Sequence, residues 1–427
     1  MDLVVVGLGY VGLPLAREAC RAGLRVAGLD RNPEVVAELR AGRTRVDDVD
    51  DGDVQAMLND GFRPSGDEAV LEGARTVVIC VPTPLTSDGG PDLGPVKAAA
   101  QAIADRLRPG TLVVLESTTY PGTTEELVLP ILERSGLVAG VDFHLAFSPE
   151  RIDPGNPEYG LRNTPKVVGG YTAACTSVAA AFYGKLVDRV VQAKGTREAE
   201  MAKLLENTYR HVNIALVNEM ALFSRELDVD LWDAIECAAT KPFGFQAFRP
   251  GPGVGGHCIP IDPNYLSYRV KQLGFPFRFV ELAQEINDRM PRYVAERAQQ
   301  ILNNEGRSVK GARILLLGVT YKNDIADQRS SPASAVARRL RALGADLAYH
   351  DPYVPVWRVD GIPVPAADGL VPALEEADLV LLLAGHREYD AALLERHARL
   401  LFDTRGHTRG RAGNRADVDQ PGRFELL

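Results

Sequence analysis

The chain has 427 residues, 45% of them apolar and 25% charged, which is the composition of a globular protein with two or three domains. A formal net charge of −9 argues against a nucleic-acid partner, because binding to phosphate backbones needs a basic surface. Five cysteines without a CxxC pair indicate neither a disulfide framework nor a zinc site, and no metal is expected.

The N-terminal region alternates short apolar runs with helical patterns. Residues 3–30 read as a strand, a glycine turn, a helix and a second strand that closes on Asp30. Further strands are predicted in ARTVVICVP (74–82), TLVVLEST (111–118) and HLAFSP (144–149), with a helix between them in 93–110. This alternation predicts a parallel sheet covered on both faces. The start of the chain lacks a signal-peptide pattern and no uncharged run reaches about 18 apolar residues, so a cytoplasmic protein is expected.

The middle of the chain reads as helical. A helix of about 30 residues is predicted over 196–227 and another over 277–303. A helix of the first length extends about 45 Å, enough to join two domains or to pair with a second subunit. An ordinary core helix explains each face of it equally well.

Strands and helices alternate again from residue 311. Ser331 and Pro332 fit the N-cap and first position of a helix, and Gly344 fits its end. The last dozen residues, 416–427, are expected to be loosely held. The predicted fold is therefore α/β: two Rossmann-like doubly wound parallel-sheet domains, joined by a long central helix and a helical middle domain. The predicted domains are 1–195, 196–305 and 306–427.

A glycine motif, GLGYVG, opens the first predicted helix. Its glycines, Gly7, Gly9 and Gly12, allow a pyrophosphate to approach a helix N-terminus, and Asp30 is placed to bind a ribose 2′-hydroxyl. The pattern predicts a dinucleotide site that prefers NAD to NADP, although the neighbouring Arg31 works against that preference. The alternative is a glycine turn that only permits tight packing.

Basic side chains offer weaker indications. Lys203 and Asn207 are four residues apart on one helical face, where they could stabilise an oxyanion. Lys322 and Arg329 follow a strand and could bind phosphates through their side chains. Taken singly, each of these cations is better interpreted as an exposed surface residue.

The segment PGPGVGGHCIPIDP, residues 250–263, places one thiol, Cys258, among glycines and prolines. Three interpretations compete: a nucleophile, a metal ligand, or a small residue in a tight corner. Backbone N–H groups favour a thiolate, whereas His257 and Asp262 are the only nearby metal ligands. Four other cysteines are interpreted as small core residues: Cys20, Cys80, Cys175 and Cys237.

Seven motifs together closely resemble those of the nucleotide-sugar 6-dehydrogenases, the family of UDP-glucose and UDP-N-acetylhexosamine dehydrogenases. The resemblance covers nearly the whole chain. Its motifs are GLGYVGLPLA, VPTP (81–84), ESTTYPGTTEE (116–126), SPER (148–151), KLLENTYRHVNIALVNE (203–219), PGPGVGGHCIPIDP and GVTYKNDIADQRSSPA.

The resemblance implies a two-step oxidation of a UDP-sugar C6 alcohol to a carboxylate with two NAD and one water. A Cys258 thiolate would add to the intermediate aldehyde, and the resulting thioester would be hydrolysed. The implied catalytic residues are Cys258, Lys203, Asn207, Asp262, Glu150 and Thr118. The implied cofactor contacts are Gly7, Gly9, Tyr10, Val11, Gly12, Asp30, Thr83, Thr118 and Arg329. The implied substrate contacts are Glu150, Lys203, Asn207, Phe248, Arg249, Gly255, Lys322 and the loop 243–249.

Local sequence also indicates a branch of that family. Animal-type UDP-glucose dehydrogenases carry a second glutamate where this chain has Pro154, and SPERIDPGNPEYG and TKPFGFQAF resemble bacterial UDP-N-acetylglucosamine dehydrogenases. UDP-N-acetylglucosamine or a related UDP-N-acetylhexosamine is therefore the expected substrate, with UDP-glucose as the alternative. A homodimer through the central helices is expected. The rivals are a two-electron dehydrogenase and a catalytically silent protein that binds NAD and UDP-sugars.

Overall fold

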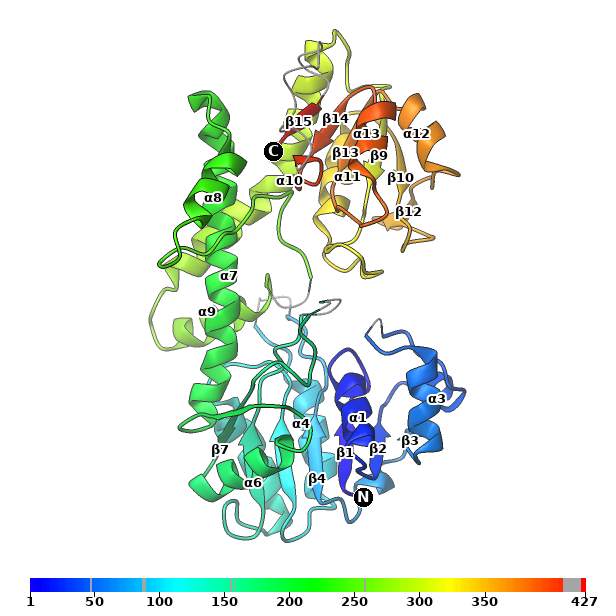
Figure 1. Cartoon of the computed structure of the whole chain (residues 1–427). Helices are drawn as coiled ribbons and strands as arrows, with labels where there is room; N and C mark the ends of the chain where they lie inside the picture. The colour runs from blue at the N-terminus through cyan, green and yellow to red at the C-terminus, as the bar shows by residue number, and fades with distance from the viewer. Residues whose placement is uncertain (47, 87–89, 154–155, 157, 257–258, 410–423) are drawn as a thin grey trace. The chain divides into compact units, whose positions relative to one another are not determined.

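The structure is a computed structural model that describes residues 1–46, 48–86, 90–153, 156, 158–256, 259–409 and 424–427. The chain divides into two compact units (Figure 1). The N-terminal unit comprises Met1–Asn207 with Asn264–Phe275, and the C-terminal unit comprises Thr208–Pro263 with Pro276–Leu427. The boundaries of the three predicted domains stay a prediction.

The N-terminal unit is built on a sheet in the order β3-β2-β1-β4-β5-β6-β7-β8, blue to green in Figure 1. Its strands are rich in valine and leucine and mostly buried on both faces, which is the composition of a parallel sheet covered by helices. They are β1 (Leu3–Val6), β2 (Val26–Leu29), β3 (Arg63–Ser65), β4 (Thr76–Ile79), β5 (Leu112–Leu115), β6 (His144–Phe147), β7 (Lys166–Gly170) and β8 (Val190–Gln192).

Helices cover both faces of this sheet because successive strand residues point to opposite sides. Leu3 and Val5 pack in one core with α1 and α6, while Val4 and Val6 pack in the other with α4 and α5. The helices are α1 (Gly12–Arg21), α2 (Pro33–Arg40), α3 (Asp51–Asn59), α4 (Gly94–Ala104), α5 (Leu129–Leu132) and α6 (Ala173–Tyr183).

One strand pairing departs from the expected parallel arrangement. β7 pairs with β6 antiparallel, whereas the other pairs of this sheet are parallel. A parallel return normally needs a helical crossover, and no helix is formed by the described residues between Phe147 and Lys166. The chain therefore turns back along β6, which puts Lys166 at the start of β7 beside residues that follow β5 and β6.

The C-terminal unit has a five-stranded parallel sheet in the order β10-β9-β13-β14-β15. Together with the first sheet and the helical region between them in the sequence, it confirms the predicted α/β fold class. The strands are β9 (Arg313–Leu317), β10 (Asp346–His350), β13 (Leu379–Leu382), β14 (Leu401–Asp403) and β15 (Phe424–Leu426), with a small hairpin of β11 (Arg358–Val359) and β12 (Ile362–Pro363). The shorter helices are α8 (Leu231–Ala239), α11 (Pro332–Ala342), α12 (Leu370–Glu376) and α13 (Ala391–His397).

The long helices match the sequence expectation closely. They are α7 (Thr196–Ser224), followed by a 3-10 turn (Arg225–Leu227), and α10 (Arg278–Asn304); the shorter α9 spans Asp262–Gln272. The predicted cap is confirmed: the Ser331 side chain accepts the Ala333 N–H, Pro332 starts α11, and Gly344 has φ +86° just after its end. Among the residues that the structure describes, no helix is long and apolar enough to cross a membrane.

The expectation of a loosely held C-terminus is wrong for residues 424–427. β15 pairs with β14, and the Trp232 indole donates to the Leu427 carbonyl at 2.7 Å. Glu425 forms ion pairs with Arg225 and with the buried Arg297. The side-chain partners, Trp232, Arg225 and Arg297, lie more than a hundred residues away in the sequence, so no local pattern indicates these contacts.

Glu200 anchors the start of α7 within the N-terminal unit. Its buried carboxylate accepts hydrogen bonds from the backbone N–H groups of Gly122 (2.6 Å) and Thr124 (2.9 Å) and from the Thr124 hydroxyl (2.7 Å). Burial outweighs these bonds and raises the pKa of Glu200 to about 7. The helix that carries Lys203 and Asn207 is thereby fixed to the segment that follows Thr118.

The raised pKa of Glu200 predicts a pH-dependent stability. Because the folded pKa exceeds the ordinary glutamate value, the carboxyl stabilises the fold most at low pH and loses roughly 3 kcal/mol of that contribution as pH rises to about 7. Glu200→Gln removes this dependence. We expect the Tm difference, wild type minus Glu200→Gln, to decrease as the pH is raised from 5 to 8, measured by thermal denaturation.

The exposed Glu72→Gln is the matched control and is expected to show the same small Tm difference at both pH values. A Tm difference between wild type and Glu200→Gln that is equal at pH 5 and pH 8 would contradict the assigned protonation.

Candidate active site

The glycine loop between β1 and α1 has the shape of a phosphate cradle. A Cβ at Gly7 would lie 2.6 Å from the Cys80 carbonyl oxygen, and Gly7 has φ +95°. A Cβ at Gly12 would lie 1.9 Å from the Gly7 carbonyl oxygen. At Gly9 a Cβ would meet nothing within 4 Å, and this residue is exposed. Two glycines are thus required for packing, while Gly9 leaves backbone open to a ligand at the start of α1.

Asp30 follows β2 and holds the glycine loop with its carboxylate. One oxygen accepts the Leu8 N–H at 2.9 Å and the other accepts the Asn32 N–H at 2.8 Å. Each carboxylate oxygen has a second acceptor position, so ribose hydroxyls can still bind. Tyr10 and Val11, between the glycines, are half-buried and pack against the core beneath the loop.

The two predicted threonine contacts lie together at the ends of neighbouring strands. Thr83 follows β4, Thr118 follows β5, and the Thr83 hydroxyl donates to the Thr118 carbonyl at 2.8 Å. Tyr265, in the part of α9 that belongs to this unit, donates to the Thr83 carbonyl. Asp30, Thr83, Thr118 and Glu150 therefore follow the C-terminal ends of β2, β4, β5 and β6, where α/β sheets bind ligands.

Glu150 is the most elaborately held of these side chains. One carboxylate oxygen accepts the backbone N–H groups of Arg151 and Ile152, both at 2.7 Å, and the other accepts Lys166 Nζ at 2.9 Å. Burial opposes ionisation of Glu150, but Lys166 and the two N–H groups outweigh it and lower its pKa. Glu150 is therefore a carboxylate near neutral pH.

Lys203 and Asn207 lie on α7 in the same unit. Lys203 is buried, and its charge also acts to lower the pKa of Glu150. Asn207 is half-buried. The roles of Lys203 and Asn207 stay a prediction.

The 250–263 loop lies in the C-terminal unit, and its glycines pack against protein. A Cβ at Gly255 would lie 2.6 Å from the Ser330 carbonyl oxygen and 2.7 Å from Tyr321 Cβ, and one at Gly256 would lie 2.8 Å from the Tyr321 ring. The Gly251 N–H donates to Asn218 at 2.9 Å, and Asn218 in turn donates to Asn287 at 2.9 Å. Packing against the segment that contains Tyr321 therefore requires residues without a side chain at positions 255 and 256.

Several predicted residues of this loop region remain predictions. Cys258 and His257, like Pro154, lie outside the described residues. Asp262 begins α9 and is buried. Within the described ranges, no group of three or more His, Cys, Asp or Glu side chains is arranged to hold a metal ion.

The other thiols differ in burial. Cys20, Cys80 and Cys175 are buried, as predicted, whereas Cys237 is exposed on α8, so its assignment to the core is wrong. Its neighbours in the sequence do not reveal which face of α8 is covered. Burial raises the pKa of Cys20 to about 12, and burial together with the Glu116 carboxylate raises the pKa of Cys80 well above its ordinary value. Neither of these two thiols is suited to act as a nucleophile.

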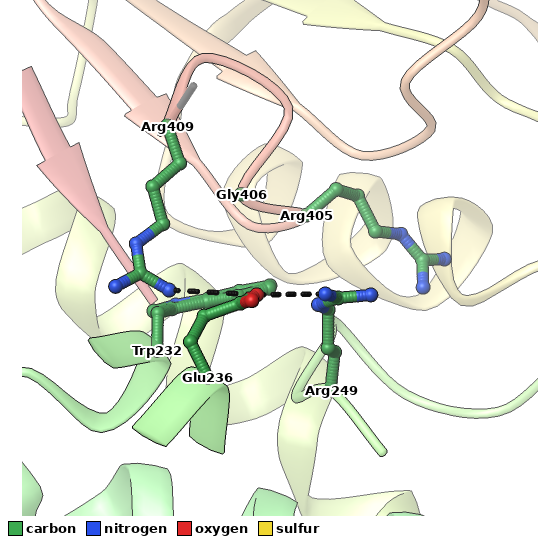
Figure 2. A pocket seen from close by; sticks show the side chains of 6 residues that line it. All are labelled: Trp232, Glu236, Arg249, Arg405, Gly406 and Arg409. Atoms are coloured by element: carbon green, nitrogen blue, oxygen red, sulfur yellow. Dashed lines mark hydrogen bonds and ion pairs between the residues drawn. The ribbon is translucent and has the colours of Figure 1, made fainter. Parts of the chain in front are cut away.

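An arginine-lined cavity of about 460 Å³ lies in the C-terminal unit (Figure 2). Figure 2 shows Glu236 between Arg249 and Arg409, with Arg249 Nη2 2.7 Å from its carboxylate. Burial lowers the pKa of Arg405 to about 10, which leaves it charged at neutral pH. Arg409 also pairs with Asp230 at 3.8 Å and Asp233 at 3.5 Å, whereas Arg249 and Arg405 supply the guanidinium groups that suit an anionic ligand such as a phosphate. The lining residues are Trp232, Glu236, Arg249, Arg405, Gly406 and Arg409.

The remaining predicted contacts of the C-terminal unit are less clearly arranged for binding. Lys322 is half-buried in the loop after β9, and its carbonyl accepts the Thr320 hydroxyl at 2.7 Å. Arg329 is paired with Asp327 through Nε at 2.8 Å and Nη2 at 2.6 Å, so reaching a cofactor would require exchange of that partner. The Phe248 ring packs edge-to-face on the Tyr209 ring, with 5.7 Å between the ring centroids.

Comparison with known proteins accounts for this arrangement. Residues 1–187 match the NAD binding domain of the UDP-glucose/GDP-mannose dehydrogenase family, residues 197–289 its central domain, and residues 315–409 its UDP binding domain. The chain belongs to this family. A UDP-N-acetyl-D-glucosamine 6-dehydrogenase of Salmonella typhi is 34% identical over 397 residues, covering 91% of each chain.

Other members of the UDP-glucose/GDP-mannose dehydrogenase family are equally similar. A UDP-N-acetyl-D-mannosamine dehydrogenase of Pyrococcus horikoshii is 34% identical over 391 residues, covering 91% of this chain and 90% of that one. A solved structure of UDP-D-ManNAc dehydrogenase from the same organism has a TM-score of 0.88 at 32% identity, covering 100% and 99% of the two chains. The protein is thus an NAD-dependent nucleotide-sugar dehydrogenase.

The glycine cradle fits the NAD that this family uses. The open backbone at Gly9, the N-terminus of α1 and the Asp30 carboxylate provide what a pyrophosphate and a ribose require. Sequence reasoning missed Glu116, Lys166, Arg405 and Arg409. Glu116 lies in a predicted strand and in the ESTTYPGTTEE motif, but nothing in the local sequence assigned it a partner.

The position of Asp30 predicts the cofactor preference. Removing its charge abolishes hydrogen bonds to the ribose, each worth about 1.5 to 3 kcal/mol, and removes the repulsion of a 2′-phosphate. We expect Asp30→Asn to raise KM for NAD about tenfold or more and to lower the NAD/NADP ratio of kcat/KM. Asn retains an acceptor for the Leu8 N–H but none for the Asn32 N–H, so one of the two hydrogen bonds that hold the loop is kept.

Asp105→Ala, at an exposed position after α4, is the control and should leave both cofactor constants unchanged. If Asp30→Asn keeps the wild-type preference for NAD, the ribose role of Asp30 is incorrect.

Proposed function

We propose that the chain oxidises the C6 hydroxymethyl group of a UDP-N-acetylhexosamine, UDP-N-acetylglucosamine first, to a carboxylate. The observation that carries the proposal is the shared edge of the N-terminal sheet, where Asp30, Thr83, Thr118 and Glu150 follow the ends of β2, β4, β5 and β6. Membership of the UDP-glucose/GDP-mannose dehydrogenase family supports it independently.

The proposed reaction balances as two hydride transfers and one hydrolysis. The alcohol loses a proton and a hydride to become an aldehyde. The Cys258 thiolate then forms a C–S bond to the aldehyde carbon, and the resulting thiohemiacetal alkoxide loses a second hydride to become a thioester. Water adds to the thioester carbon, the C–S bond breaks, and carboxylate and thiolate are released. When bound, NAD supplies the acceptor for each hydride.

Side chains of this chain would handle the protons and the oxyanions. The Lys203 ammonium and the Asn207 amide would stabilise the alkoxide and the tetrahedral oxyanion, and Lys203 would assist removal of the first proton. Glu150, ionised by its hydrogen-bond partners, would receive a proton from the hydrolytic water. Thr118 would contact the same water and the nicotinamide, and Asp262 would order a water near Cys258.

Charged groups of the C-terminal unit support binding of a diphosphate. The cavity that contains Arg249, Arg405 and Arg409 has the charge for it, and Lys322 and Gly255 are the further contacts expected. Arg329, Phe248 and the 243–249 loop stay predictions, as do the homodimer through the central helices and the cytoplasmic location.

The reaction stoichiometry tests the proposal. We expect two NADH per sugar oxidised, measured by absorbance against product analysis. One NADH per sugar would identify a two-electron dehydrogenase, and none would identify a silent binding protein.

Cys258→Ser should abolish turnover and leave UDP-sugar binding near the wild-type value, measured by calorimetry.

Cys237→Ser is the matched control, because this exposed thiol lies on α8 and is expected to be dispensable. Uronate formation by Cys258→Ser at the wild-type rate would rule out the covalent route.

The sugar itself is tested by steady-state kinetics on UDP-N-acetylglucosamine, UDP-N-acetylmannosamine, UDP-glucose and UDP-galactose. The 148–160 and 240–248 segments support the first, although the chain is 34% identical to relatives named for the first and for the second. We expect kcat/KM for UDP-N-acetylglucosamine to exceed that for UDP-glucose by about tenfold or more, because a site that binds the acetamido group loses those contacts without it. A higher value for UDP-glucose would assign the chain to the alternative activity.

A further inference from the structure

Behind Glu150 lies a buried cluster of charges that the proposed reaction does not use. Lys166, the first residue of β7, has a side chain only 4% exposed. Its Nζ lies 2.9 Å from Glu150 Oε2 and 3.0 Å from Glu116 Oε1. Glu116 immediately follows β5 and is fully buried. One ammonium thus bridges two carboxyl groups from adjacent strand ends.

The two carboxyl groups are held differently. Glu116 accepts a hydrogen bond from the Tyr183 hydroxyl on α6 and contacts the Cys80 thiol after β4 at 3.8 Å. Glu150 accepts two backbone N–H groups and is the only one of the pair with an exposed side chain, at 11%. Burial raises the pKa of Glu116, whereas Lys166 and the N–H groups bring the pKa of Glu150 below its ordinary value. The two carboxyl groups that share the Lys166 ammonium are thus shifted in opposite directions.

Other charged groups face Glu150 from neighbouring elements. Lys203 acts on it from α7. Arg151 follows Glu150 directly, but its guanidinium pairs with Glu206 on α7 at 2.7 Å and donates to the Pro165 carbonyl at 2.7 Å. Lys166 is thus the cation in direct hydrogen-bond contact with the Glu150 carboxylate.

Stability alone does not explain these charges. Replacing a buried ion cluster by apolar side chains of similar volume is often neutral or stabilising, because taking charges out of water is expensive. The remainder of β7, by contrast, is made of valine and glycine that pack in the ordinary way. A function for the charge of Lys166 is the simpler explanation.

We propose that Lys166 is a positioning residue that holds Glu150 as an oriented carboxylate at the active site, with Glu116 as the second carboxyl partner of the lysine. This inference rests on the proposed function, in which Glu150 receives the proton of the hydrolytic water. A protonated Glu150 cannot take up that proton, so hydrolysis stops below the pKa of Glu150. Because the charge of Lys166 lowers this pKa, Lys166 sets the lower pH limit of thioester hydrolysis.

The test uses the full-length protein with NAD and the 6-aldehyde of the preferred UDP-sugar, which isolates the second oxidation and the hydrolysis. Lys166→Met removes the charge at similar size. We expect the acid limb of its kcat profile to move to higher pH by about 1 to 3 pH units, because an opposite charge in contact lowers a carboxyl pKa by that amount. Lys166→Arg retains the charge and should restore the limb toward the wild-type position.

Glu116→Gln makes the inference distinguishable from general damage to the cluster. It leaves Lys166 with Glu150 as its one carboxylate partner, so the acid limb should stay at or below the wild-type pH. Loosened packing would instead affect Lys166→Met and Glu116→Gln alike at every pH. The exposed Lys185→Met is the control and should match the wild type. An unmoved limb in Lys166→Met, or an upward shift in Glu116→Gln, overturns the inference.

Glu150→Gln separates this inference from the proposed function. It should give a burst of one NADH per site followed by slow hydrolysis. Wild-type hydrolysis by Glu150→Gln would refute the proposed role of Glu150, whereas slow hydrolysis together with an unmoved limb in Lys166→Met would refute only the role of Lys166. If Lys166→Met does not fold, the ionisation of Glu150 is measured directly by infrared pH titration of the wild type, with Glu150→Gln identifying the Glu150 band. The inference requires Glu150 to stay ionised at pH values below the ordinary glutamate pKa, and protonation at or above that pKa overturns it.

Discussion

The burial of the central parallel strands of the N-terminal sheet is the constraint on which the rest of the site depends. Because helices cover both faces, polar side chains can meet a ligand only where the strands end. Asp30, Thr83, Thr118 and Glu150 occupy those ends in β2, β4, β5 and β6, with β1 between the first two strands. The sheet order fixes their sequence in space, so residues more than a hundred positions apart form one edge without any loop having to reach across the molecule.

The same burial forces charged groups behind that edge to find partners, and the structure uses two arrangements. Glu200 is surrounded by donors from Gly122 and Thr124 and keeps a proton readily, so no cation is required. Glu116 and Glu150 instead share Lys166, whose ammonium lowers the pKa of Glu150. The first arrangement fixes a helix, and the second places a carboxylate after β6, at the edge of the sheet where ligands bind.

Local rules account for what could be predicted from the sequence. The glycine loop, the strands that precede Asp30 and Thr118, and the Ser331–Pro332 helix start follow from propensities within a few residues. Lys166 and Glu116 were out of reach because their partnership depends on the antiparallel turn of β7, and a lysine in a short apolar strand has no distinguishing local pattern. β15 was missed for the same reason: its partners, Arg225 and Arg297, are remote.

The contact between the 250–263 loop and the segment after β9 has a consequence for how this chain can diverge. At Gly255 the nearest obstacle is the Ser330 carbonyl oxygen, a backbone atom, so no replacement of the Tyr321 side chain alone makes room for a larger residue there. At Gly256 the obstacle is the Tyr321 ring itself. Two motifs some seventy residues apart therefore restrict each other's sequence. A larger residue at Gly255 is tolerated only if the backbone of the segment after β9 also shifts.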